Sequence, residues 1–142
     1  MTSFPPRHAI SRADFFLTLA SSCTASQKND FEAFLEAAII FARTAIHRLQ
    51  HEFKHHPDWP TWFQALKGNP SIDFFKEHRD LTLKESSPKV GQRIGFQSVS
   101  TAEELYFFQP DEPAIKTVRN HLNTIAKIVY EASTRFNKPP TT

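Results

Sequence analysis

The chain has 142 residues, of which 39% are hydrophobic and 23% charged, with 14 phenylalanines but only 3 glycines. A chain this rich in aromatic residues is not intrinsically disordered, and its length fits one folded domain. The 17 Lys and Arg residues and 15 Asp and Glu residues leave a net charge of +2, too small to indicate a nucleic-acid-binding protein by itself.

Targeting and membrane signals are not visible in the sequence. The first ten residues lack the charged segment and apolar stretch of a signal peptide, and no apolar run approaches the roughly 20 residues that span a bilayer. Cys23 is the single cysteine and has no partner for an internal disulfide, which suits a reducing compartment. We therefore expect a soluble, cytoplasmic protein without membrane contact. We expect one domain over residues 1–142, with flexible ends at 1–10 and 138–142.

The first predicted helix starts at Ser11 and Asp14, because a serine followed three residues later by an acid satisfies the free amides of a helix start. Apolar residues at helical spacing then predict its buried face: Phe15, Phe16, Leu19 and Cys23. We expect Cys23 to be a small buried side chain rather than a nucleophile.

The second helix is predicted from a cap-like pair, Asn29 and Glu32, to about His56, because Pro57 disfavours helix in the residue before it. Its apolar residues repeat every three or four positions: Phe31, Phe34, Leu35, Ala38, Ala42, Ala45, Ile46, Leu49 and Phe53. At 1.5 Å per residue the helix is about 40 Å long, which predicts that it forms the spine of a helical bundle.

Three more helices are predicted along the chain. The motif Asp58-Trp59-Pro60 begins a short helix that ends at Gly68, and Asn69-Pro70 begins another that ends near Ser86. The last helix follows Asp111-Glu112-Pro113, ends at Asn137, and buries one stripe: Ile115, Val118, Leu122, Ile125 and Val129.

Residues 89–108, before the last helix, partly alternate in polarity and predict a short hairpin or an ordered irregular insertion. The predicted fold is therefore all-α, a bundle of four to five helices with this hairpin or irregular insertion before the last one.

Charge is unevenly distributed near the end of the chain. Residues 114–142 contain one acid, Glu131, and five bases, whereas residues 94–113 contain four acids and no base. The bases are Lys116, Arg119, Lys127, Arg135 and Lys138. Such a helix either faces a phosphate backbone or forms a solvated surface beside an acidic neighbour, and we favour the solvated surface.

The run from His51 to His55 matches the zinc-protease pattern H-E-x-x-H, and His47 adds an imidazole one turn earlier. However, Lys54 would bring a cation beside the metal, and Pro57 ends the helix directly after the motif. Asp58 also replaces the glycine of the extended pattern. We therefore expect an exposed polar stripe, no metal site and no cofactor.

Arg79 is the most informative charged residue. It stands four residues after Phe75 and four before Leu83, so it projects from the apolar face of its helix. A buried guanidinium is costly unless a carboxylate, a carbonyl or a phosphate pairs with it. Carboxylates that could do so are Asp80, Glu32 and Glu36. Alternatively, the stem of Arg79 extends along the bundle and its charge reaches solvent at the rim.

Three segments in this order resemble the HEPN superfamily, and more closely its uncharacterised bacterial HEPN-like members. They are Phe-Leu-Glu-Ala-Ala at 34–38, Ala-Arg-Thr-Ala at 42–45, and Phe-Phe-Lys-Glu-His-Arg-Asp-Leu-Thr-Leu-Lys-Glu at 74–85. The resemblance covers residues 31–88 and implies one HEPN-like helical domain over residues 1–142. Because many HEPN domains are metal-independent ribonucleases that pair as dimers, it also implies RNA and a second copy of the chain as partners.

The family signature is an Arg, a polar residue, and a His four to six residues after the Arg. Arg79 and Asp80 match its first two positions, but Lys84 and Glu85 stand where the His belongs. An unperturbed lysine, with a pKa of about 10.4, is a poor general base. We therefore predict a non-catalytic HEPN-like module that binds a partner protein, RNA or a nucleotide as a homodimer, through Arg79, Lys84, His78 and Glu85.

Two alternatives stay open. One is a toxin-like, metal-independent ribonuclease in which Arg79 and Asp80 act with a non-standard general base, Lys84 or His78. The other is a helical bundle whose polar residues only complete a dimer interface.

Overall fold

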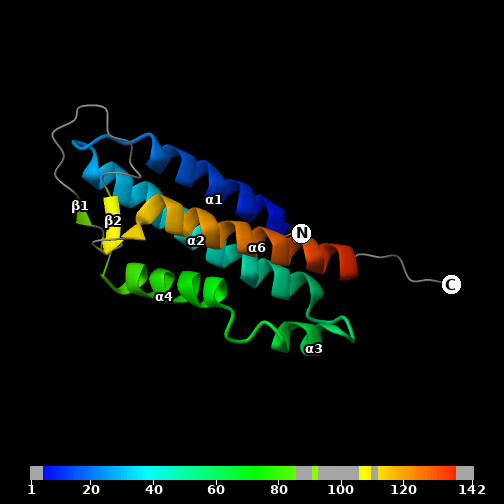
Figure 1. Ribbon diagram of the computed structural model, residues 1–142. Helices are drawn as coiled ribbons and strands as arrows, with labels where there is room; N and C mark the ends of the chain where they lie inside the picture. The colour runs from blue at the N-terminus through cyan, green and yellow to red at the C-terminus, as the bar shows by residue number, and fades with distance from the viewer. Residues whose placement is uncertain (1–4, 86–90, 93–105, 110–111, 137–142) are drawn as a thin grey trace.

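Five helices and three short strands form the part of the chain that the structure describes (Figure 1). This computed structural model describes the backbone of residues 5–85, 91–92, 106–109 and 112–136. It describes the side chains of these residues except 79–85, 91–92, 107 and 109. The helices are α1 (Pro6–Ser21), α2 (Lys28–Phe53), α3 (Trp59–Gln64), α4 (Pro70–Glu85) and α6 (Ala114–Phe136). The predicted all-α bundle is confirmed.

Helices α1, α2, α4 and α6 run alternately up and down the bundle (Figure 1). Helices α2 and α6 contact each other, and α1 and α4 each contact both of them. The core is therefore built around α2 and α6, with α1 on one side and α4 on the other (Figure 1). In the described residues, no helix combines the length and the apolar character needed to cross a membrane.

Helix α2 is the predicted spine and runs unbroken over 26 residues. The residues predicted to face inward are buried, apart from the partly buried Phe34. The predicted cap at Asn29 was wrong, because the helix already begins at Lys28. The side-chain oxygen of Gln27 instead accepts a hydrogen bond from the Thr24 amide at 3.0 Å, which closes the turn before the helix.

Helix α1 begins at Pro6, so the predicted start at Ser11 was wrong, and residues 6–10, predicted to be flexible, belong to this helix. Proline suits the first turn of a helix, because a backbone N–H at that position would have no partner within the helix and proline has none. The buried face also differs from the predicted one: it consists of Pro6, Ala9, Ala13, Leu17 and Ala20. Phe15 is 57% exposed, while Cys23, just after the helix, is buried as expected.

A small antiparallel sheet connects α4 to α6. Strand β1 (Gly91–Gln92) pairs with β2 (Tyr106–Gln109), and β2 pairs with β3 (Glu112–Pro113). The pairing of β1 with β2 confirms the predicted hairpin, and residues 89–90 and 93–105 of that prediction lie outside the described residues. Glu112 and Pro113, predicted to open the last helix, form β3, so α6 begins at Ala114.

The turn between α3 and α4 contains Gly68 and Asn69, the residues predicted to separate the two helices. Gly68 has a φ of +84°, a left-handed conformation that glycine adopts without strain. The side-chain oxygen of Asn69 accepts hydrogen bonds from the amides of Ser71 and Ile72, at 2.9 and 3.2 Å. Asn69 therefore caps α4, and the helix begins at Pro70, where its start was predicted.

Helix α6 buries its predicted stripe. Arg119 forms an ion pair with Asp14 of α1, which joins the two helices across the bundle. Lys116, Lys127 and Arg135 are exposed. Lys138 lies outside the described residues.

Candidate functional site

The residues predicted to bind or to act all lie on α4, which remains helical through Glu85. His78 is described in full, whereas the side chains of Arg79, Asp80, Lys84 and Glu85 lie outside the described residues. Arg79 therefore occupies the helical position next to His78, and its predicted pairing stays a prediction.

Two carboxylates predicted as partners of Arg79 lie on α2. Glu32 forms an ion pair with Lys28 at 3.5 Å, within the first turns of the same helix. Glu36 is partly buried, and burial raises the pKa of its carboxyl group.

His78 packs into a group of aromatic rings between α4 and the sheet. Its imidazole lies 4.3 Å from the ring of Phe74 and 5.1 Å from the ring of Phe108 on β2, centroid to centroid. The two phenylalanine rings meet edge to face at 5.9 Å. All three side chains keep part of their surface exposed.

His121 of α6 lies on the same ring of Phe74. The two rings are stacked at 4.3 Å, with 21° between their planes. The Nδ1 atom of His121 shares a hydrogen bond of 2.7 Å with the hydroxyl of Ser71, in the first turn of α4. We call Ser71, Phe74, His78, Phe108 and His121 the imidazole cluster.

Burial favours the neutral form of both imidazoles in the cluster. It lowers the pKa of His78, against the opposing charges of Glu77 and Glu112, and His121 lowers that pKa further. Burial also lowers the pKa of His121, with Glu112 again opposing the shift. The cluster therefore offers imidazole rings whose neutral form is favoured and which can stack on another ring.

The pair of Ser71 and His121 does not form a nucleophilic site. A serine nucleophile needs an exposed oxygen and nearby free amides for the developing oxyanion. Ser71 is only 5% exposed, and Asn69 already occupies the amides of Ser71 and Ile72. The hydrogen bond instead fixes the orientation of the His121 ring.

The H-E-x-x-H motif is interrupted by the end of α2. His51, Glu52 and His55 are exposed, as predicted for the two histidines. Helix α2 ends at Phe53, so His55 lies beyond the helix that the metal-binding spacing requires. Among the residues that the structure describes, no three His, Cys, Asp or Glu side chains come together where they could hold a metal ion.

Sequence reasoning missed His121. The residue lies three positions after Val118 and four before Ile125, both on the buried stripe of α6. This spacing indicates a partly buried histidine. It does not reveal the hydrogen-bond partner, because Ser71 is 50 positions away in the chain.

Comparison of the chain with protein-family models, curated proteins and solved structures gives no match. The resemblance to HEPN proteins therefore depends on the sequence segments at 34–38, 42–45 and 74–85 alone.

Proposed function

We propose that the chain is a HEPN-like helical module that binds RNA or a nucleotide at the imidazole cluster and the adjoining turns of α4, without cleaving the RNA. One observation supports this proposal most directly. Two partly buried imidazoles, His78 and His121, pack at 4.3 Å against one ring, Phe74, on the helix that continues into Arg79.

This arrangement suits an unpaired base and its phosphate. Bases of single-stranded RNA stack on aromatic and imidazole rings, and His78 and Phe108 are partly exposed. Arginine and lysine bind phosphate oxygens through charge-assisted hydrogen bonds, and Arg79 and Lys84 follow on the same helix.

The protonation states of the two histidines in the cluster favour binding over cleavage. Cleavage through the 2′-hydroxyl needs one group that accepts a proton and a second that donates one. Because the pKa values of His78 and His121 are both lowered, neither is a ready acid near neutral pH. Lys84 stands where the family has its histidine, and its amine is a poor base at that pH.

The test is binding of a short fluorescein-labelled single-stranded RNA, followed by anisotropy at several salt concentrations. We expect an Arg79→Ala, Lys84→Ala double variant to bind the RNA more weakly. The slope of the logarithm of its binding constant against the logarithm of the salt concentration should be shallower by about 0.7 for each phosphate that the variant no longer binds. The variant His78→Ala should weaken binding by about 1–3 kcal/mol with an unchanged slope, because it removes an uncharged stacking surface.

Two exposed residues outside the cluster provide controls. Lys127→Ala and His55→Ala remove the same kinds of side chain, and each should bind like the wild type. The proposal fails if the wild type does not bind RNA or nucleotides, or if the double variant binds as tightly as the wild type.

A metal-independent ribonuclease is the second candidate. It is favoured by the hydrogen bond that fixes His121 to Ser71 beside His78, since an acid–base pair needs two oriented groups. Cleavage of the same RNA in the presence of a chelator, lost in His121→Ala and kept in His55→Ala, would establish this candidate in place of simple binding.

We also propose that the module forms a homodimer, in which two copies of Arg79, Asp80 and Lys84 line a cationic cleft. Sedimentation of the protein with and without the RNA measures this directly. We expect the mass of two chains, and a monomer that binds RNA unchanged would refute the dimer while leaving RNA binding intact.

A further inference from the structure

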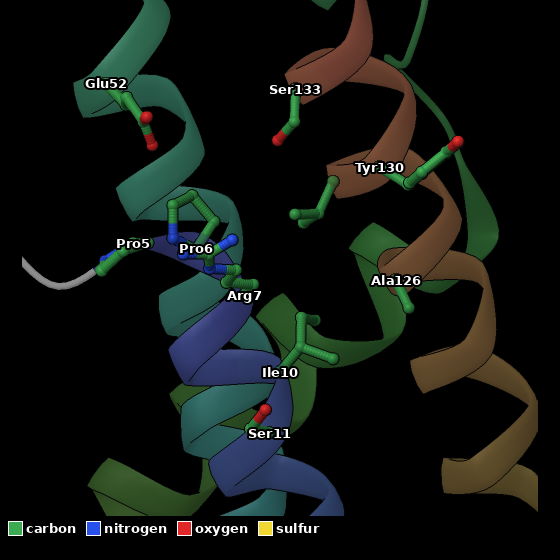
Figure 2. Close-up of a pocket in the computed structure, with 10 residues that line it drawn as sticks. Pro5, Pro6, Arg7, Ile10, Ser11, Glu52, Ala126, Tyr130 and Ser133 are labelled. Carbon is green, nitrogen blue, oxygen red and sulfur yellow. The ribbon is translucent and has the colours of Figure 1, made fainter. Parts of the chain in front are cut away.

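A hollow separate from the imidazole cluster lies where α1 begins, α2 ends and the second half of α6 passes them (Figure 2). Its volume is about 530 Å³, which is within the range of pockets that hold small molecules. None of the residues of the imidazole cluster lines it. We call it the terminal pocket.

Apolar side chains from two helices line much of the terminal pocket. Pro6 and Ile10 come from α1, and Ala126 and Val129 come from α6. Pro6 and Val129 are buried, so this part of the lining is continuous with the core. An apolar group placed here would be shielded from water on one side.

Two opposite charges also line the terminal pocket, from different helices. Arg7 stands in the first turn of α1, and Glu52 stands near the end of α2. Within the part of the chain that the structure describes, neither side chain forms an ion pair, with the other or with a third residue. Figure 2 shows Glu52 and Ser133 directing their side-chain oxygens toward the space between α2 and α6.

We propose that the terminal pocket binds a small zwitterion with an apolar body, an α-amino acid with a large apolar side chain. Arg7 would pair with its carboxylate, and Glu52 with its ammonium group, beside the hydroxyl of Ser133. The apolar side chain would lie on Ile10 and Val129. This site is independent of RNA binding at the imidazole cluster.

The balance of charge selects this class of ligand. A nucleotide or another anion pairs with Arg7 but is repelled by Glu52, and an amine is attracted to Glu52 but repelled by Arg7. A zwitterion matches both charges at once. A neutral apolar compound leaves both of them without a partner.

The probe is L-phenylalanine, titrated into the full chain while backbone amide shifts are followed by NMR. We expect saturable shifts around Ile10, Ala126 and Val129, with a dissociation constant in the millimolar range. Two analogues each lack one charge: 3-phenylpropanoate has no ammonium group, and 2-phenylethylamine has no carboxylate. Each should bind about tenfold more weakly than phenylalanine, because one charge-assisted hydrogen bond is missing.

Variants assign the two charges. Glu52→Gln should weaken the binding of phenylalanine about tenfold, so that this variant binds phenylalanine no better than 3-phenylpropanoate. Arg7→Gln should weaken the binding of phenylalanine by the same factor, so that this variant binds phenylalanine no better than 2-phenylethylamine. Matched controls are Glu131→Gln and Arg135→Gln, whose side chains line a second hollow on α6 and do not line the terminal pocket. The proposal is overturned if phenylalanine does not bind, if the analogues bind equally well, or if the control variants weaken binding as much.

Discussion

His121 is held by two different kinds of contact. Its ring stacks on Phe74, and its Nδ1 atom shares a 2.7 Å hydrogen bond with Ser71, a nearly fully buried hydroxyl. Both contacts are available to the neutral imidazole. Burial opposes the charged form and lowers the pKa of His121 below its ordinary value of 6.5. The residue therefore links the stability of the fold to pH.

The sign of this linkage follows from the two states. Below about pH 6.5 the unfolded chain binds a proton at His121 more readily than the folded chain does, so the free energy of unfolding falls as the pH drops. His121→Asn removes the titration and keeps a polar group near Ser71. Its loss of stability between about pH 7 and pH 5, measured by urea unfolding, should be smaller than that of the wild type. His55→Asn, at an exposed position, should follow the wild type, and an unchanged acid response in His121→Asn would refute the linkage.

At the scale of the element, the size of the side chains explains which face of α1 is buried. Its inner face carries mainly alanines, including Ala9, Ala13 and Ala20. Small side chains let two helices approach closely, whereas larger ones hold their axes farther apart. Phe16 lies at the edge of this contact, where its ring stacks on Phe41 of α2 at 5.7 Å, and Phe15 faces solvent.

The same substitution on two helices tests this assignment. Phe31→Ala on α2 removes a fully buried ring and should cost about 3–5 kcal/mol of unfolding free energy. Phe15→Ala on α1 removes a ring that is 57% exposed and should cost about 0.5 kcal/mol or less. Urea unfolding measures both values, and equal losses would contradict the observed orientation of α1.

At the scale of the molecule, Tyr106 joins the sheet to α2 and to the turn between α1 and α2. It is fully buried on β2, and its ring stacks on Phe31 with the centroids 4.0 Å apart. Its hydroxyl donates a hydrogen bond of 2.5 Å to the carbonyl of Thr24, in the turn between α1 and α2. This one side chain therefore joins segments that are 82 positions apart.

Tyr106→Phe separates the hydrogen bond from the ring contact. The variant keeps the stacking on Phe31 and should lose about 1 kcal/mol of unfolding free energy, the usual value of one hydrogen bond. Because burial raises the pKa of Tyr106, the wild type should also lose stability as the pH rises above about 10, and the variant should lose less. A variant as stable as the wild type at neutral pH would show that the hydroxyl contributes nothing.

Local patterns in the sequence were sufficient for most of the helices. The stripe from Phe31 to Phe53 predicted α2, and the stripe from Ile115 to Val129 predicted α6, because apolar residues at helical spacing must share one buried face. Gly68 and Asn69 predicted the turn before α4, because a left-handed φ and a capping oxygen depend only on residues close in the chain.

Only the tertiary structure decided which residues meet across the bundle. It placed Ser71 against His121 and Tyr106 against Thr24, and it brought Arg7 and Glu52 to one pocket. These contacts depend on how each helix is rotated and how its neighbours are spaced, and that is determined by packing the whole core at once. No periodicity within one helix contains this information, so the sequence by itself predicted the bundle, and the packing of its helices determined which residues form the sites.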